Sequence, residues 1–179
     1  MRTRLRRSIA DGKNLLFFNG IFVLLFTPST APPEDTYIEA AMFDLHPQLA
    51  NDTETVLELD ICRVLLMNDS RYPWIILVPR QENLVELHDL DADIYPRVMA
   101  EIRQASRLMK ELFSAHKVNV GALGNMVSQL HIHVVARHEG DAAWPGPVWG
   151  VGTAIPYSEA DEIGRAARIR RGFDAYKTS

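Results

Sequence analysis

The sequence predicts an α+β fold, an antiparallel β-sheet with one long and one or two shorter helices packed on it. Two patterns predict it. Short runs rich in Ile, Val and Leu alternate with turn-forming residues, as in antiparallel strands, and one long stretch repeats its apolar residues every three or four positions, as in an amphipathic helix. The chain has 179 residues, 47% of them hydrophobic, which suffices for one domain with a substantial core.

The first elements are a short helix and a hairpin. We predict the helix over residues 52–59, with Asp52 or Thr53 as its cap. Residues 61–67 and 74–78 are rich in Ile, Val and Leu, and a turn-forming cluster separates them. These two runs predict a β-hairpin.

The longest helical pattern opens at residues 90–93 and extends to about residue 116. A second strand pair follows, residues 117–123 and 130–137, joined by a turn at Gly124 and Asn125. The run Ser-Glu-Ala-Asp at residues 158–161, with its two acidic side chains, then predicts the start of a C-terminal helix that stops near Gly172. Helices on one face of an antiparallel sheet are the architecture expected.

Two histidines one residue apart are the most informative feature of the chain. Apolar and polar residues alternate through this segment, so Gln129, His131 and His133 share one strand face at intervals of about 7 Å. Glycine and polar residues that can form an anion-receiving loop stand just upstream, namely Gly124, Asn125 and Ser128. The segment therefore predicts a phosphate site.

The run Gly-Asn-Met-Val-Ser-Gln-Leu-His-Ile-His-Val-Val at residues 124–135 resembles the signature of the histidine-triad (HIT) superfamily. That signature is His, apolar, His, apolar, His, apolar, apolar. Here Gln129 replaces the first histidine, and the second and third fall on His131 and His133. The resemblance extends more loosely over residues 42–140 and implies a HIT-like α+β fold. By the same resemblance His131 is the nucleophile, and the missing first histidine bears on how that nucleophile is supported.

The resemblance implies a nucleotide hydrolase or nucleotidyl transferase. His131 would attack the α-phosphate of a nucleoside phosphoramidate or (di)nucleoside polyphosphate and form a nucleotidyl-histidine intermediate. His133 and Gln129 complete the expected catalytic set, and backbone N–H groups of residues 125–128 would hold phosphate oxygens. No cofactor is expected to be required, although Mg²⁺ can assist polyphosphate substrates by binding their oxygens.

The expected nucleotide-binding residues are Asn68, Asn119, Asn125 and Val127. By resemblance Asn68 lies against the ribose, although Asp69 can take that part and a turn-forming role has equal weight. Asn119 and Asn125 would lie beside the phosphate channel, and a left-handed turn is the other explanation for Asn125.

Two other functions stay open. One is a nucleotide-binding or sensing module that kept the pocket but lost catalytic turnover; the replacement of the first histidine by Gln129 would be the sign of that loss. Less favoured is a metal-dependent hydrolase using the histidine pair. Zinc needs three or four ligands, and a third would come from Glu139 or Asp141, which have no characteristic spacing; we therefore assign no metal ligands.

Residues 1–41 are predicted to be a leader or tether outside the family-like region, and residues 42–179 a single HIT-like domain with a C-terminal helix. Basic residues precede the apolar run 15–26 in the order of a secretory signal. That run is too short for stable membrane insertion. We expect a cytoplasmic protein, exported if residues 1–31 act as a signal peptide, and Met42 is an alternative start.

Charge and cysteine content narrow the remaining classes. The formal net charge of −4 argues against a nucleic-acid partner, so the expected partners are a small nucleotide substrate and, by resemblance, a second copy in a homodimer. The single cysteine, Cys62, is expected to be a buried structural thiol. Arginines at 165, 168, 170 and 171 are expected to form a solvated helix face.

Overall fold

The computed structural model describes residues 8–10, 13–18, 21–24 and 43–177, which belong to two units, residues 1–40 and 41–179. In the first unit, strands β1 (Ser8–Ala10), β2 (Lys13–Phe18) and β3 (Ile21–Leu24) pair antiparallel in that order. The rest of the predicted leader, including residues 25–41, lies outside the described residues, and its role stays a prediction.

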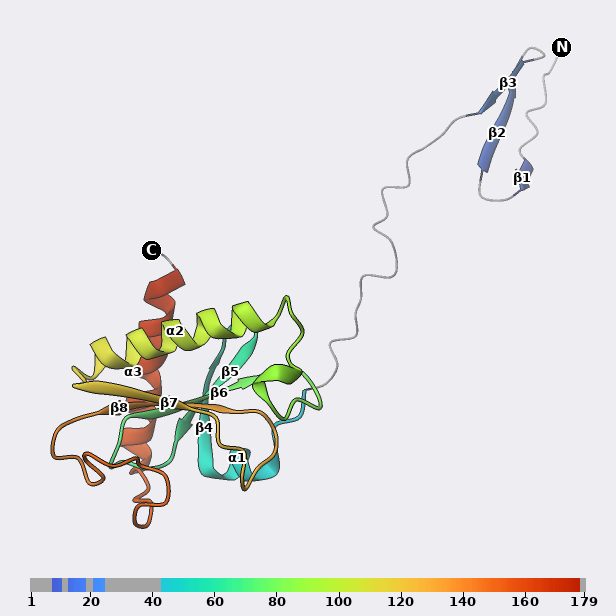
Figure 1. Cartoon of the computed structure of the whole chain (residues 1–179). Coiled ribbons are helices and arrows are strands. Elements are labelled where there is room, and N and C mark those ends of the chain that lie inside the picture. Colours follow the sequence, from blue (N-terminus) through green and yellow to red (C-terminus); the bar gives the residue numbers. More distant parts are fainter. Residues whose placement is uncertain (1–7, 11–12, 19–20, 25–42, 178–179) are drawn as a thin grey trace. The chain divides into compact units, whose positions relative to one another are not determined.

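The second unit contains one five-stranded sheet (Figure 1). Its strands are β4 (Thr53–Glu58), β5 (Cys62–Met67), β6 (Trp74–Pro79), β7 (Lys117–Gly121) and β8 (Ile132–Arg137). Their order is β4-β5-β6-β8-β7, and every neighbouring pair is antiparallel. The predicted α+β class and the hairpin of β5 and β6 are confirmed.

Over residues 43–177, three α-helices and a short 3₁₀ turn, η2 (Leu87–Asp89), accompany the sheet. The α-helices are α1 (Pro47–Asp52), α2 (Tyr95–Leu112) and α3 (Glu159–Lys177). Side chains of α2 and α3 pack on one face of the sheet, here called the helix face, whereas Leu49 of α1 packs on the other, here called the site face. In the described part of the chain, none of the helices combines the length and apolarity that crossing a membrane requires.

The prediction of a helix over residues 52–59 is wrong. The helix lies just upstream, where Pro47 occupies its first turn and the His46 ring accepts a hydrogen bond from the Gln48 N–H at 3.1 Å. The following residues pair with β5 because Val56, completely buried, completes the helix-face core. A segment this short does not carry enough periods to distinguish helix from strand.

Two helix ends also differ from the prediction. The long helix ends at Leu112 rather than near residue 116, because Ser114 adopts a left-handed backbone with φ 50°. The last helix continues past Gly172 to Lys177. A Cβ on Gly172 would lie 2.5 Å from a methyl carbon of Leu108, so this glycine allows α3 to approach α2 and does not end the helix.

Other residues singled out in the sequence have structural partners. Cys62 is completely buried, as expected, and burial raises the pKa of its thiol. The C-terminal arginines do not only form a solvent-exposed helix face. Arg168 donates to the Leu112 carbonyl at the end of α2, and Arg170 donates to the Val56 carbonyl of β4. These arginines attach α3 to the rest of the unit.

Candidate active site

A cavity of about 340 Å³ on the site face contains both motif histidines. His131 lies just before β8 and His133 is the second residue of that strand. The strand begins at Ile132, two residues later than predicted, and residues 122–131 form a loop rather than a tight turn. The cavity wall also includes residues of α1, β5 and β6 and of the loops around 123–127 and 149–150.

His131 is held by its own backbone. Its ring Nδ1 lies 2.7 Å from the Gln129 carbonyl oxygen, and only 7% of the residue is exposed. Because a carbonyl can only accept, Nδ1 carries the proton of the neutral ring and Nε2 retains its lone pair. The imidazole is therefore fixed in the tautomer that can act as a nucleophile through Nε2.

His133 has the opposite tautomer. The indole N–H of Trp74 donates to its Nδ1 at 3.0 Å, so the proton of the neutral ring is on Nε2. Burial, and secondarily the nearby His131, lower the pKa of His133 from 6.5 to about 3. The two rings lie 4.9 Å apart between centroids. A lone pair on one ring and an N–H donor on its neighbour thus share one cavity.

Tryptophans surround His133, a feature that sequence reasoning missed. The rings of Trp74 and Trp149 lie 5.3 and 5.6 Å from its ring, both edge to face. The Trp149 indole nitrogen is buried without a hydrogen-bond partner and its ring lines the cavity. From the sequence, the run 144–149 is either a cap over the site or an interface, or simply two packed tryptophans on a loop. The available signal for Trp74 was strand alternation, which puts it on one face of β6 with Ile76 and Val78.

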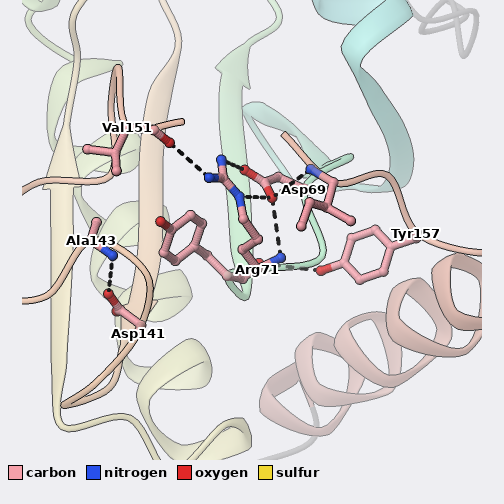
Figure 2. A network of polar contacts seen from close by, with 8 residues as sticks. Asp69, Arg71, Asp141, Ala143, Val151 and Tyr157 are labelled. Atoms are coloured by element: carbon pink, nitrogen blue, oxygen red, sulfur yellow. Dashed lines mark hydrogen bonds and ion pairs between the residues drawn. The ribbon is translucent and has the colours of Figure 1, made fainter. Parts of the chain in front are cut away.

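Asp69 and Arg71 anchor the loop that carries Trp149 (Figure 2). The Arg71 guanidinium forms two hydrogen bonds to the Asp69 carboxylate, at 2.8 and 2.6 Å, and a third to the Val151 carbonyl. Asp69 also accepts from the Ile155 N–H at 3.3 Å. Burial would raise the pKa of Asp69, but these hydrogen bonds outweigh it and lower that pKa. The network therefore fixes one wall of the cavity.

A second ion pair anchors the beginning of the same loop. The Arg137 guanidinium, at the end of β8, forms two hydrogen bonds to Asp141, at 2.7 and 2.8 Å. Those bonds are the main cause of the lowered pKa of Asp141. Arg137 is 1% exposed, so its charge depends on this partner.

The structure divides the four predicted nucleotide-binding residues. Asn125 and Val127 line the cavity. Asn68 does not, because its side-chain oxygen accepts from the Tyr157 N–H at 2.9 Å. Asn119 is also absent from the wall, because its side-chain oxygen accepts from Arg137 at 2.7 Å. The last two residues stabilise loops and strands that border the site.

Gln129 does not extend the polar face of β8 as predicted. The strand geometry that would align it with His131 and His133 begins only at Ile132, and Gln129 is not part of the cavity wall. Its amide instead donates to the Asp44 carbonyl and accepts from the His46 N–H, both at 2.9 Å.

The histidine pair gains no third ligand from the residues considered for a metal site. Asp141 is paired with Arg137, and Glu139 lies 3.4 Å from His116. Within residues 43–177 and the described strands before them, no three His, Cys, Asp or Glu side chains gather in an arrangement suited to a metal ion.

Comparison with known proteins gives a family match and a curated relative. A family model described as HIT domain matches residues 48–140. The chain is 30% identical over 122 residues to a Mycobacterium tuberculosis protein named AP-4-A phosphorylase, an alignment that covers 64% of this chain and 63% of that protein. The chain thus spans less than two thirds of this curated relative.

Two solved structures of bacterial proteins described as histidine triad proteins are also similar. One, from Sinorhizobium meliloti, is 41% identical with a TM-score of 0.73 and is matched over 74% of this chain and 98% of its own. The other, from Marinobacter aquaeolei, is 45% identical with a TM-score of 0.73, over 75% and 98%. The chain belongs to the HIT domain family.

Proposed function

We propose that this protein is a nucleotide hydrolase or nucleotidyl transferase that acts at the α-phosphate through a covalent nucleotidyl-His131 intermediate. The substrate would be a nucleoside phosphoramidate or a (di)nucleoside polyphosphate. The observation that carries the proposal is the 2.7 Å contact between His131 Nδ1 and the Gln129 carbonyl, which leaves Nε2 as the nucleophilic nitrogen in the cavity.

In the first step, the Nε2 lone pair of His131 attacks the α-phosphorus. The bond from phosphorus to the leaving group breaks, and the leaving group departs with the electron pair and takes a proton from solvent. His131 needs no separate base because the ring proton lies on Nδ1 and Nε2 presents its lone pair. The N–H of His133 and backbone N–H groups of residues 125–128 hold the phosphate oxygens on which charge accumulates.

In the second step, an oxygen nucleophile attacks the same phosphorus and the bond to Nε2 breaks. Water gives the nucleoside monophosphate and releases one proton, whereas inorganic phosphate gives the nucleoside diphosphate. The relative named AP-4-A phosphorylase supports a dinucleoside polyphosphate as one substrate class. Product analysis with and without phosphate distinguishes a hydrolase from a transferase.

The apolar part of the cavity suits a nucleobase. Leu49, Trp74 and Trp149 line it together with the histidines, and flat aromatic side chains favour stacking against a planar base. We further propose that the protein works as a cytoplasmic homodimer, binds no nucleic acid, and requires no cofactor beyond Mg²⁺ carried by a polyphosphate substrate.

The test compares the wild type with His131→Ala on adenosine phosphoramidate and diadenosine tetraphosphate. We expect the variant to lose turnover by about 10³-fold or more while it still binds AMP, because the nucleophile acts in the chemical step. A covalent α-³²P label on the wild type that survives base and is lost in acid, and that is absent from the variant, identifies the phosphorus–nitrogen bond of the adduct. His88→Ala is the matched control, since that side chain is 83% exposed outside the cavity. Full turnover by His131→Ala would overturn the proposal.

The same assay separates the other two functions. A wild type that binds AMP but releases no product would be a nucleotide-binding module. The phosphoramidate carries no polyphosphate and so needs no substrate-bound Mg²⁺. If a chelator abolishes hydrolysis of this substrate, the protein is the metal-dependent hydrolase.

A further inference from the structure

Gln129 connects the reacting histidine with a distant segment of the chain. Its side-chain N–H donates to the Asp44 carbonyl and its side-chain oxygen accepts from the His46 N–H, both at 2.9 Å. These two backbone groups flank Leu45, and a primary amide presents a donor and an acceptor side by side to match them. The Gln129 amide therefore pairs with residues 44–46 much as a neighbouring strand would.

The segment held by Gln129 leads directly into one wall of the cavity. His46 is the N-cap of α1, and its ring accepts from the Gln48 N–H. Gln48, Leu49 and Asp52 of this helix line the cavity, and Leu49 is buried in the site-face core. Fixing residues 44–46 thus fixes where α1 begins.

The backbone of the same residue holds the other side of the site, because the Gln129 carbonyl accepts from His131 Nδ1. One residue therefore orients the imidazole through its main chain and α1 through its side chain. We propose that Gln129 is a positioning residue that sets the α1 wall against His131 and so controls nucleotide affinity. This inference rests on the proposed nucleotide site.

The glutamine is suited to this role and a histidine is not. The two nitrogens of an imidazole point away from each other around the ring, so one ring cannot bond both peptide groups beside Leu45. An amide also never titrates. Where the family signature has a titratable histidine, this chain therefore has a neutral amide that forms two hydrogen bonds to the segment preceding α1.

The experiment uses the full chain with Gln129→Ala, Gln129→Met and Gln129→His. Each variant keeps the backbone carbonyl, and Met also keeps most of the side-chain length without either hydrogen bond. We expect the Kd for AMP and the KM for the phosphoramidate to rise about five-fold in each variant, with kcat changed by less than about two-fold. Gln104→Ala on α2, which removes an amide outside the cavity, is the matched control and leaves both constants unchanged.

The hydrogen-exchange rate of the His46 backbone N–H, measured by NMR, reports its hydrogen bond to Gln129 in the absence of nucleotide. We expect faster exchange in all three Gln129 variants and the wild-type rate in Gln104→Ala. Unchanged exchange together with an unchanged AMP Kd would overturn the proposal, as would a fall in kcat at constant KM, which would place the amide at the phosphate. A wild type without turnover would contradict the proposed function alone, because exchange and AMP binding still decide the role of Gln129.

Discussion

The two faces of strand β8 differ in how they are stabilised. Ile132, Val134 and Ala136 point to the helix face and join a large core of apolar side chains. One buried carboxylate borders that core, because Glu101 of α2 accepts from the Ile61 and Cys62 N–H groups. On the site face the alternate positions are His133, Val135 and Arg137, and the loops above them are held by buried polar contacts. Both faces bury apolar side chains, but the site face adds more buried polar partners, among them the Trp74–His133 and Arg137–Asp141 contacts.

This difference shows where function is placed in the fold. Apolar burial is non-directional, so the helix face tolerates changes that conserve volume. A buried charge or ring nitrogen is stable only with its partner, so the site face tolerates few changes but fixes catalytic groups in one geometry. Substitutions on the two faces should therefore differ in kind as well as in size.

The largest effect is expected for Arg137→Met on the site face. The variant leaves the Asp141 carboxylate, whose side chain is 8% exposed, without its guanidinium. The free energy of unfolding, measured by urea denaturation, should fall by about 3–5 kcal/mol. The double variant Arg137→Met/Asp141→Leu should recover most of this loss because it removes both charges. A double variant as unstable as the single one would show that the site face depends on packing after all.

A smaller effect is expected for Gly172→Ala on the helix face. The added Cβ would meet Leu108 at 2.5 Å, and overpacking of this kind costs about 1–3 kcal/mol of unfolding free energy. The matched control is Gly164→Ala in the same helix, where a Cβ meets nothing within 4 Å; it should stabilise the protein by about 0.5–1 kcal/mol. Neither variant should alter kcat, and a change in kcat by Gly172→Ala would mean that the two faces are coupled.

The effect of pH is the smallest per unit of change, and it accumulates as the pH falls. The pKa of His133 is about 3 in the folded protein and 6.5 as its ordinary value, so between these values the unfolded chain binds more protons. Unfolding free energy should therefore decrease as pH falls from 6.5, by about 1 kcal/mol per pH unit from this residue. His133→Gln should lack that part of the slope, with His88→Gln as the control. Equal slopes in His133→Gln and wild type would indicate that the site face admits water.

Local patterns in the sequence were sufficient for much of the fold. The hairpin of β5 and β6 follows from two runs rich in Ile, Val and Leu with a turn cluster between them, and the long helix from an apolar repeat over 18 residues. The helix over 52–59 was mispredicted because a six-residue segment carries little periodicity and its pairing with β5 is a tertiary contact. Asn68 and Asn119 were assigned to the nucleotide by resemblance alone. Their hydrogen bonds with Tyr157 and Arg137 could not be predicted, because these partners are distant in sequence.

The sequence by itself determined that alternate residues from Ile132 onward face opposite sides of the sheet and that two histidines lie one residue apart, because side-chain alternation is a property of the local backbone. Only the tertiary structure decided the partners: Trp74 for His133 across 59 positions, and residues 44–46 for Gln129 across more than 80. Tautomer and pKa depend on those partners and on burial. They therefore follow from the packing of distant segments and cannot be derived from the motif.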